Sequence, residues 1–130
     1  MIAVCLHCKV HYKPLKNAKG IYCSVKCQAQ LKQKTVIDAW LSGIHPGYTG
    51  KTLQLCNAAR TWLHQTRGTA CSQCGWDQRH PDDGSVLTEI DHIDGDAKNC
   101  RPDNLRILCP NCHSMTSTFR ARNKSSSRIR

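Results

Sequence analysis

The stretch from Val86 to His113 reads VLTEIDHIDGDAKNCRPDNLRILCPNCH, and its pattern decides the fold. It opens with a β-type apolar run that ends in the adjacent pair Asp91 and His92. A loop rich in Asp, Gly, Asn and Pro follows, and a second apolar run covers residues 105–108. The stretch closes on Cys-Pro-Asn-Cys-His, which predicts a helix start. We therefore expect two strands joined by a polar loop, followed by a helix that carries His113.

Polar residues at the two ends of this stretch suit metal-assisted hydrolysis. Asp91 and His113 can bind a divalent cation. His92 can act as a base, because an imidazole with its ordinary pKa of about 6.5 is largely neutral at neutral pH. Asp94 and Asp96 are further candidate ligands, although acids in turns more often bond to the local backbone. Neighbours on a strand point to opposite faces, so the strand must end or twist at the Asp-His pair.

Close cysteine pairs frame this stretch and recur near the N-terminus. Ten cysteines are present, and eight of them form four short-spaced pairs, the spacing of tetrahedral zinc sites. We expect two structural zinc ions, each enclosed by four thiolates with no open position. The first set is Cys5, Cys8, Cys23 and Cys27, and the second is Cys71, Cys74, Cys109 and Cys112. Neither Cys56, placed in a helix, nor Cys100, placed in the polar loop, is assigned as a ligand.

Composition limits the size of any apolar core. The chain has 130 residues, 5% aromatic residues and a mean hydropathy of −0.52, which indicates one domain or two very small ones. Such a chain needs stabilisation beyond apolar burial, and zinc supplies it. The opening MIAVCLHCK has no apolar core long enough for a signal peptide, and no transmembrane span is expected. Thiolates on zinc favour a reducing compartment, so we expect a cytoplasmic protein.

Charge is distributed in blocks. The formal net charge is +10, yet eight of the nine acids lie between Asp77 and Asp103. Seven lysines and no acids fall in residues 1–34, and five Lys or Arg fall in residues 119–130. A basic envelope around an acidic centre suits a polyanionic substrate that needs a cation where it reacts. A solvated basic face that only confers solubility explains the charge equally well.

Asp91-His92, Asn104 and His113, set in a frame of Cys-x-x-Cys pairs, resemble the HNH endonucleases and their ββα-metal motif. The resemblance covers about residues 68–120. It implies a small α+β fold: a zinc-stabilised ββα-metal core with an N-terminal zinc finger and connecting helices. The alternative is a purely structural zinc-bound loop in which the Asp and His residues have no catalytic role.

The resemblance also implies site roles. His92 would activate water, and Asn104 would orient the loop that carries His92. Asp91 and His113 would hold one catalytic divalent ion, Mg²⁺ or Mn²⁺. Hydrolysis of a DNA phosphodiester would then leave 5′-phosphate and 3′-hydroxyl ends. A third polar ligand, often found after the last His, has no certain counterpart among Asn111, Ser114 and Thr116.

The rest of the chain divides around this core. Residues 1–34 resemble a treble-clef-like zinc finger, residues 35–67 form a helical connector, residues 68–122 the nuclease domain, and residues 123–130 a basic tail. Helices are expected at about 24–34, 35–42 and 53–66, and the helix carrying His113 is expected to continue through residue 123. The residues expected to contact nucleic acid are Lys9, Lys13, Lys16, Arg120 and Arg122.

Three functions compete on the sequence alone. The first is an active HNH endonuclease or nickase of the phage or mobile-element type, with DNA as partner. The second is a non-catalytic, zinc-stabilised DNA-binding or adaptor protein, and the third is a protein-binding module. The intact set of site residues favours the first. Target sequence, strand preference, biological role (homing, restriction, packaging or repair) and oligomeric state stay open.

Overall fold

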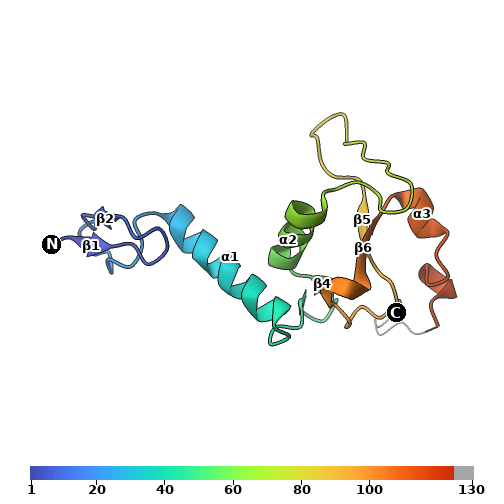
Figure 1. Ribbon diagram of the computed structural model, residues 1–130, viewed down its shortest axis with the longest axis horizontal. Coiled ribbons are helices and arrows are strands. Elements are labelled where there is room, and N and C mark those ends of the chain that lie inside the picture. Colours follow the sequence, from blue (N-terminus) through green and yellow to red (C-terminus); the bar gives the residue numbers. More distant parts are fainter. Residues whose placement is uncertain (125–130) are drawn as a thin grey trace.

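A zinc-finger-like unit and a larger α+β body lie at opposite ends of one long helix (Figure 1). The computed structural model describes residues 1–124, so most of the predicted basic tail lies outside the described residues. Short strand pairs and three α-helices make up residues 1–124, which confirms the small α+β class. In the described part of the chain, no helix combines the length and the apolar character that crossing a membrane demands.

The N-terminal unit is a short hairpin followed by a capped helix. β1 (Ala3–Val4) pairs antiparallel with β2 (His11–Tyr12). The helix α1 begins after Ser24, whose hydroxyl accepts a hydrogen bond from the Cys27 amide at 3.1 Å. This cap satisfies one of the amides left without a partner at a helix start. The hairpin and the cap therefore bring the four N-terminal cysteines to one place.

α1 is a single helix, Val25–Leu41, where the sequence predicted two. The prediction of a break near residue 34 is wrong because no glycine or proline interrupts the segment. The Thr35 hydroxyl donates to the Leu31 carbonyl at 2.9 Å, so this residue bonds within the helix instead of ending it. The proposed boundary between finger and connector falls inside α1, and the two units share one continuous backbone.

The connector contains a hairpin that the sequence analysis missed. β3 (Tyr48–Thr49) pairs with β4 (Gln54–Leu55), and α2 runs over Asn57–Arg67. The expected start of this helix at about residue 53 is wrong, because Leu53 has a φ of +57° and ends a tight turn. The expected end at about residue 66 is confirmed to within one residue: α2 ends at Arg67, and Gly68, with a φ of +79°, follows it.

The C-terminal body contains the two strands and the helix expected from the sequence. β5 (Glu89–His92) pairs antiparallel with β6 (Leu105–Leu108), so that Asp91 lies opposite Arg106. A 3-10 turn, η1 (Pro102–Asn104), leads into β6. The helix α3 (Pro110–Ser114) follows with Cys109 as its cap. Its predicted continuation through residue 123 is wrong: α3 ends at Ser114, and a separate 3-10 turn, η2, covers Arg120–Arg122.

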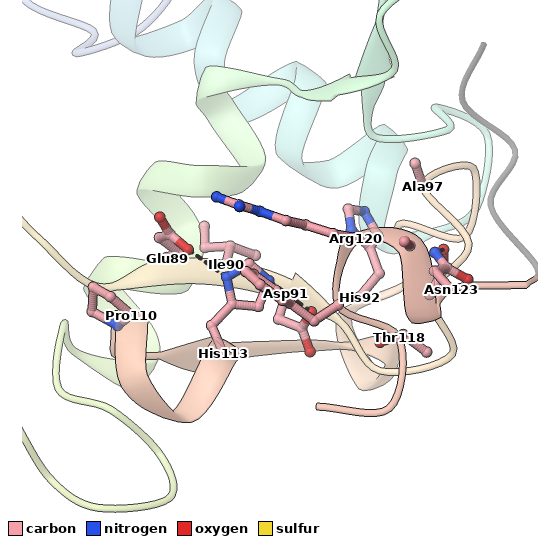
Figure 2. A pocket seen from close by; sticks show the side chains of 13 residues that line it. Glu89, Ile90, Asp91, His92, Ala97, Pro110, His113, Thr118, Arg120 and Asn123 are labelled. Atoms are coloured by element: carbon pink, nitrogen blue, oxygen red, sulfur yellow. Dashed lines mark hydrogen bonds and ion pairs between the residues drawn. The ribbon is translucent and has the colours of Figure 1, made fainter. Parts of the chain in front are cut away.

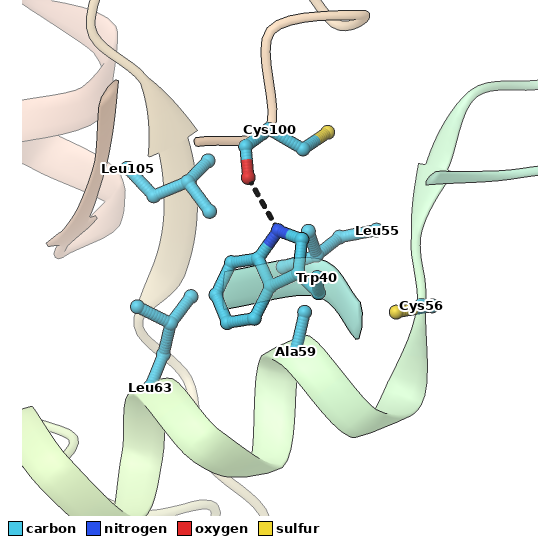
Figure 3. Packing of buried hydrophobic residues seen from close by; sticks show 7 residues of the cluster. All are labelled: Trp40, Leu55, Cys56, Ala59, Leu63, Cys100 and Leu105. Atoms are coloured by element: carbon cyan, nitrogen blue, oxygen red, sulfur yellow. Dashed lines mark hydrogen bonds between the residues drawn. The ribbon is translucent and has the colours of Figure 1, made fainter. Parts of the chain in front are cut away.

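One indole joins the long helix to this body. Trp40, in the last turn of α1, is fully buried, and its Nε1 donates to the Cys100 carbonyl at 2.7 Å (Figure 3). Arg101, the next residue after Cys100, donates in turn to the Trp40 carbonyl at the end of α1, at a distance of 2.6 Å. The surrounding cluster draws on α1, β4, α2, the β5–β6 loop and β6: Trp40, Leu55, Cys56, Ala59, Leu63, Cys100 and Leu105. The core therefore fixes the loop that follows β5.

Replacing Trp40 by phenylalanine tests this link. Trp40→Phe removes an N–H whose acceptor stays buried, so the free energy of unfolding should fall by about 1–3 kcal/mol. Urea unfolding measures it. Trp62→Phe is the matched control, because that half-buried ring packs edge-on against Trp40 at a centroid distance of 5.3 Å. Equal losses from the two changes would contradict a special role for the hydrogen bond.

Candidate metal and catalytic site

A cavity of about 870 Å³ lies between β5, the start of α3 and the segment that ends in η2 (Figure 2). All four residues of β5 line it. In the part of the chain that the structure describes, β5 pairs only with β6, so its other edge is open. Side chains from both faces of the strand can reach a cavity at an open edge. Asp91 and His92 can therefore both line the cavity, although as neighbours on a strand they point to opposite faces.

Asp91 and His113 present ligand atoms side by side in this cavity. Asp91 is 6% exposed, and its Oδ2 accepts a hydrogen bond from Arg106 Nε at 2.8 Å. Its other oxygen, Oδ1, lies 3.4 Å from His113 Nε2. Two donor atoms at this separation can bind one divalent cation, with the carboxylate held in place from behind by Arg106. The geometry is that of an open site with room for further ligands.

Glu89 is a site residue that the sequence analysis missed. Its Oε2 contacts Nδ1 of His113, the ring nitrogen that faces away from Asp91. The Phe119 ring packs edge-on against the same imidazole at a centroid distance of 5.2 Å. A carboxylate on the second nitrogen of a ligating histidine fixes its tautomer and raises its basicity. The available signal was the period of two along β5, which puts Glu89 on the face of Asp91.

His92 ends β5 and lines the same cavity. Its Nε2 lies 3.5 Å from the Cys100 sulfur, and that buried thiol also donates to the Ala97 carbonyl at 3.2 Å. Cys100 therefore contacts the imidazole that the sequence analysis predicts to be a base. No feature of the sequence indicated this contact, since the two residues meet only when the loop folds back.

Asn104 organises the loop after His92. Its Oδ1 accepts from the Asp94 amide at 3.1 Å, and its Nδ2 donates to Asp94 Oδ1 at 2.9 Å and to the Asn99 carbonyl at 2.8 Å. Burial raises the pKa of Asp94, but hydrogen bonds from Asn99, Asp96 and Asn104 outweigh it and lower the pKa below its ordinary value. Asp94 and Asp96 bond to the loop itself and do not line the cavity.

Both sets of four cysteines are assembled. In each set the four sulfurs lie within 4.8 Å of one another, and no disulfide links the cysteines of residues 1–124. Cys8 and Cys23 are 3.6 Å apart at sulfur, as are Cys74 and Cys109. A tetrahedral ion with Zn–S bonds of about 2.3 Å places its sulfurs about 3.8 Å apart. Either set could hold zinc.

The thiols influence one another strongly. Burial raises the pKa of Cys5 and Cys71, but backbone hydrogen bonds outweigh it and lower both to about 6. Hydrogen bonds with the neighbouring thiols Cys27 and Cys109 raise the pKa of Cys23 and Cys112, respectively, to about 12. Zinc binds cysteine as the thiolate, so an ion in either set would release the protons of these thiols.

The residues expected to contact nucleic acid fall into two groups. Lys9, Lys13 and Lys16 are exposed on the N-terminal unit, and the Lys9 ammonium donates to the Leu6 carbonyl at 2.7 Å. Arg120 and Arg122 are exposed on η2, but only Arg120 of the two lines the cavity. The two groups lie on opposite ends of the molecule (Figure 1).

Comparison with known proteins matches the segment that builds this site. Residues 81–115 match a family model described as HNH endonuclease. Over 53 residues the chain is 40% identical to the H-N-H endonuclease F-TflIV of Escherichia phage T5. That alignment covers 41% of this chain and 22% of the phage protein, so the chain spans about a fifth of that relative. No solved structure matches the chain significantly.

Glu89→Gln tests the geometry of the cation site. Glutamine keeps the size of the side chain but loses the charge that orients His113, so Mn²⁺ affinity should fall by about 10–100-fold. Calorimetric titration of Mn²⁺ measures it. Asp82→Asn removes one charge from a carboxylate whose side chain is 88% exposed and should leave the affinity unchanged. Equal affinities for wild type and Glu89→Gln would exclude the orienting role.

Proposed function

We propose that the chain is, through residues 81–115, a member of the HNH endonuclease family and acts as a metal-dependent DNA endonuclease or nickase. The observation that carries the proposal is the convergence of three side chains on one cavity. Asp91 Oδ1 and His113 Nε2 lie 3.4 Å apart, and His92 lines the same cavity. Hydrolysis of a phosphodiester needs a cation site and a base next to each other, and these residues provide both.

Each residue has one task in the proposed reaction. His92 accepts the proton of the attacking water. Asp91 and His113 hold a divalent cation, Mg²⁺ or Mn²⁺, with Arg106 and Glu89 orienting them through hydrogen bonds. When bound, that cation supplies Lewis-acid stabilisation of the phosphate and of the departing oxygen. Asn104 makes no contact with the reacting atoms; it keeps the His92 loop in place. The products would carry 5′-phosphate and 3′-hydroxyl ends.

DNA is the proposed partner on electrostatic grounds. The formal net charge of +10 favours a polyanion, and Lys9, Lys13 and Lys16 place positive charge far from the cavity. A long duplex can contact the N-terminal unit and the cavity together, since α1 separates the two (Figure 1). A phage relative and the zinc-binding thiols suit a protein that acts in the cytoplasm of a bacterial host.

A second candidate rests on the surface of the N-terminal unit. Several apolar side chains are exposed there, among them Ile2 at 64%, Leu6 at 51% and Leu15 at 83%. Exposed apolar side chains gathered in one small unit are typical of a surface that meets another protein. A non-catalytic DNA-binding or adaptor protein is therefore the alternative. It differs from the first candidate in one measurable respect, the cleavage of DNA.

His92→Ala tests the proposed function directly. The wild-type protein should nick supercoiled plasmid in the presence of Mg²⁺ or Mn²⁺. The variant should be about 10²–10⁴-fold slower, because a general base acts in the transition state. DNA affinity, measured by a gel-shift titration without cleavage, should change little.

His80→Ala is the matched control, since His80 is a histidine outside the cavity. That variant should cleave as fast as wild type. A wild-type protein that binds DNA and never cleaves it would favour the adaptor. Cleavage by His92→Ala within about tenfold of wild type would remove His92 from the role of base.

The proposed zinc content is two ions per chain, one in each set of four thiolates. Elemental analysis should find two zinc ions in wild type, one in Cys27→Ala and two in Cys56→Ala, whose thiol belongs to neither set. Mild EDTA should stop cleavage before the chain unfolds, because an open site holds its ion more loosely than a closed thiolate shell. Zinc-free protein with disulfides in place of these sites would refute the assignment.

A further inference from the structure

We propose that the Arg120 guanidinium binds the scissile phosphate in the cavity, donating to its two non-bridging oxygens. The inference rests on the proposed nuclease function and adds a residue to it. Arg120 lies outside the ββα unit, on η2, yet it lines the same cavity as Asp91 and His113. Figure 2 shows its side chain extending past Ile90 toward the side of the cavity where Glu89 lies.

The negative charge of the cavity lining is the first argument for a cationic side chain that binds the phosphate. Two carboxylates, Glu89 and Asp91, line it, and both repel a phosphodiester anion. Among the described residues that line the cavity, Arg120 alone carries a Lys or Arg side chain. Arg106 donates to Asp91 from the neighbouring strand and does not line the cavity. A guanidinium presents two parallel donors that match two phosphate oxygens, and its charge opposes the charge that develops in the transition state.

The backbone around Arg120 is arranged to aim it. Arg120 has a φ of +49°, in the left-handed region that side chains other than glycine rarely adopt. Its guanidinium carbon lies 5.0 Å from the centroid of the Phe119 ring, and that ring packs on His113. The orientation of Arg120 is thus linked to that of a cation ligand. Unusual backbone conformations of this kind persist where the surroundings enforce them.

The backbone conformation of Arg120 is enforced by contacts with the loop that follows His92. Asn123 donates to the Gly95 carbonyl at 2.7 Å, which ties the end of η2 to that loop. A Cβ on Gly95 would lie 2.8 Å from both Asn123 Oδ1 and Thr118 Cγ2, so only glycine allows the approach. The segment from Thr118 to Asn123 is therefore seated on the catalytic loop, with Arg120 between its two contact points.

The experiment compares cleavage at saturating enzyme. Supercoiled plasmid with Mg²⁺ or Mn²⁺ is cut under single-turnover conditions by wild type, Arg120→Asn, Arg120→Lys and Lys124→Asn. Asparagine accepts a positive φ, so Arg120→Asn removes the guanidinium without added backbone strain. Lys124→Asn is the matched control: it removes one exposed charge from the same segment, outside the cavity. Zinc content and thermal melting establish that each variant is folded.

We expect Arg120→Asn to lower the single-turnover rate about 10²–10³-fold, the effect of losing one donor to transition-state charge. Arg120→Lys should be at least tenfold slower than wild type, because an ammonium cannot bind two oxygens in the same plane. Lys124→Asn should stay within threefold. If Arg120→Asn does not fold, the rate of Arg120→Lys decides.

Contrary results separate the two proposals. A wild-type protein that never cuts refutes the nuclease function and this inference with it. If wild type cuts while Arg120→Asn stays within threefold, or slows no more than Lys124→Asn, the nuclease stands and Arg120 has no such role. An Arg120 variant that weakens binding but reaches the wild-type rate at saturation overturns the inference too, since the contact would then be an ordinary one with the DNA backbone.

Discussion

The antiparallel register of β5 and β6 is the constraint on which the candidate site depends. Pairing Asp91 with Arg106 lets that arginine hold one carboxylate oxygen, so the other oxygen faces His113. The same register puts His92 opposite Leu105 and brings Asn104 to the end of the loop that His92 begins. A slip of one residue would turn every one of these side chains to the opposite face. The four-residue ladder therefore sets which polar groups can meet.

A ladder this short needs outside support, and three elements supply it. The Cys71 set joins the chain before β5 to the start of α3, across an excursion of 34 residues between Cys74 and Cys109. Arg67, at the end of α2, donates to the Leu105 and Pro102 carbonyls at 2.6 and 2.7 Å. Trp40 holds the Cys100 carbonyl from α1. Thiolates, a guanidinium and an indole thus do what a larger apolar core would do in a longer protein.

The same supports relate the N-terminal unit to the site. α1 begins at the finger cysteines and ends at Trp40, so one rigid element runs from the first set of thiols to the loop that carries the candidate base. Arg101 adds hydrogen bonds to the last carbonyls of α1, at Trp40 and Leu41. Within the described residues the finger and the cavity are thereby held at opposite ends of the molecule. A polymeric substrate can span that separation, and a small one cannot.

The sequence by itself determined the parts of this protein whose chemistry is local. Cys-x-x-Cys spacing and the adjacent pair Asp91 and His92 span only a few residues, and Asn104 and His113 follow in a recognisable order, so these features could be identified without coordinates. The hairpin of β3 and β4 and the early end of α3 were not predicted, because both depend on pairing and packing with other segments. Propensity alone does not report such contacts.

Only the tertiary structure decided which side chains surround the site. Glu89 reaches His113 across 24 residues, Cys100 meets His92 where the loop turns back, and Arg120 enters from a segment with no motif of its own. Each of these contacts forms because the strand pairing, the Cys71 set of thiols and the contacts around Gly95 bring separate segments to one cavity. Strand periodicity indicates the face on which Glu89 lies. No pattern in the sequence indicates these three contacts, because the segments that make them meet only when the chain folds.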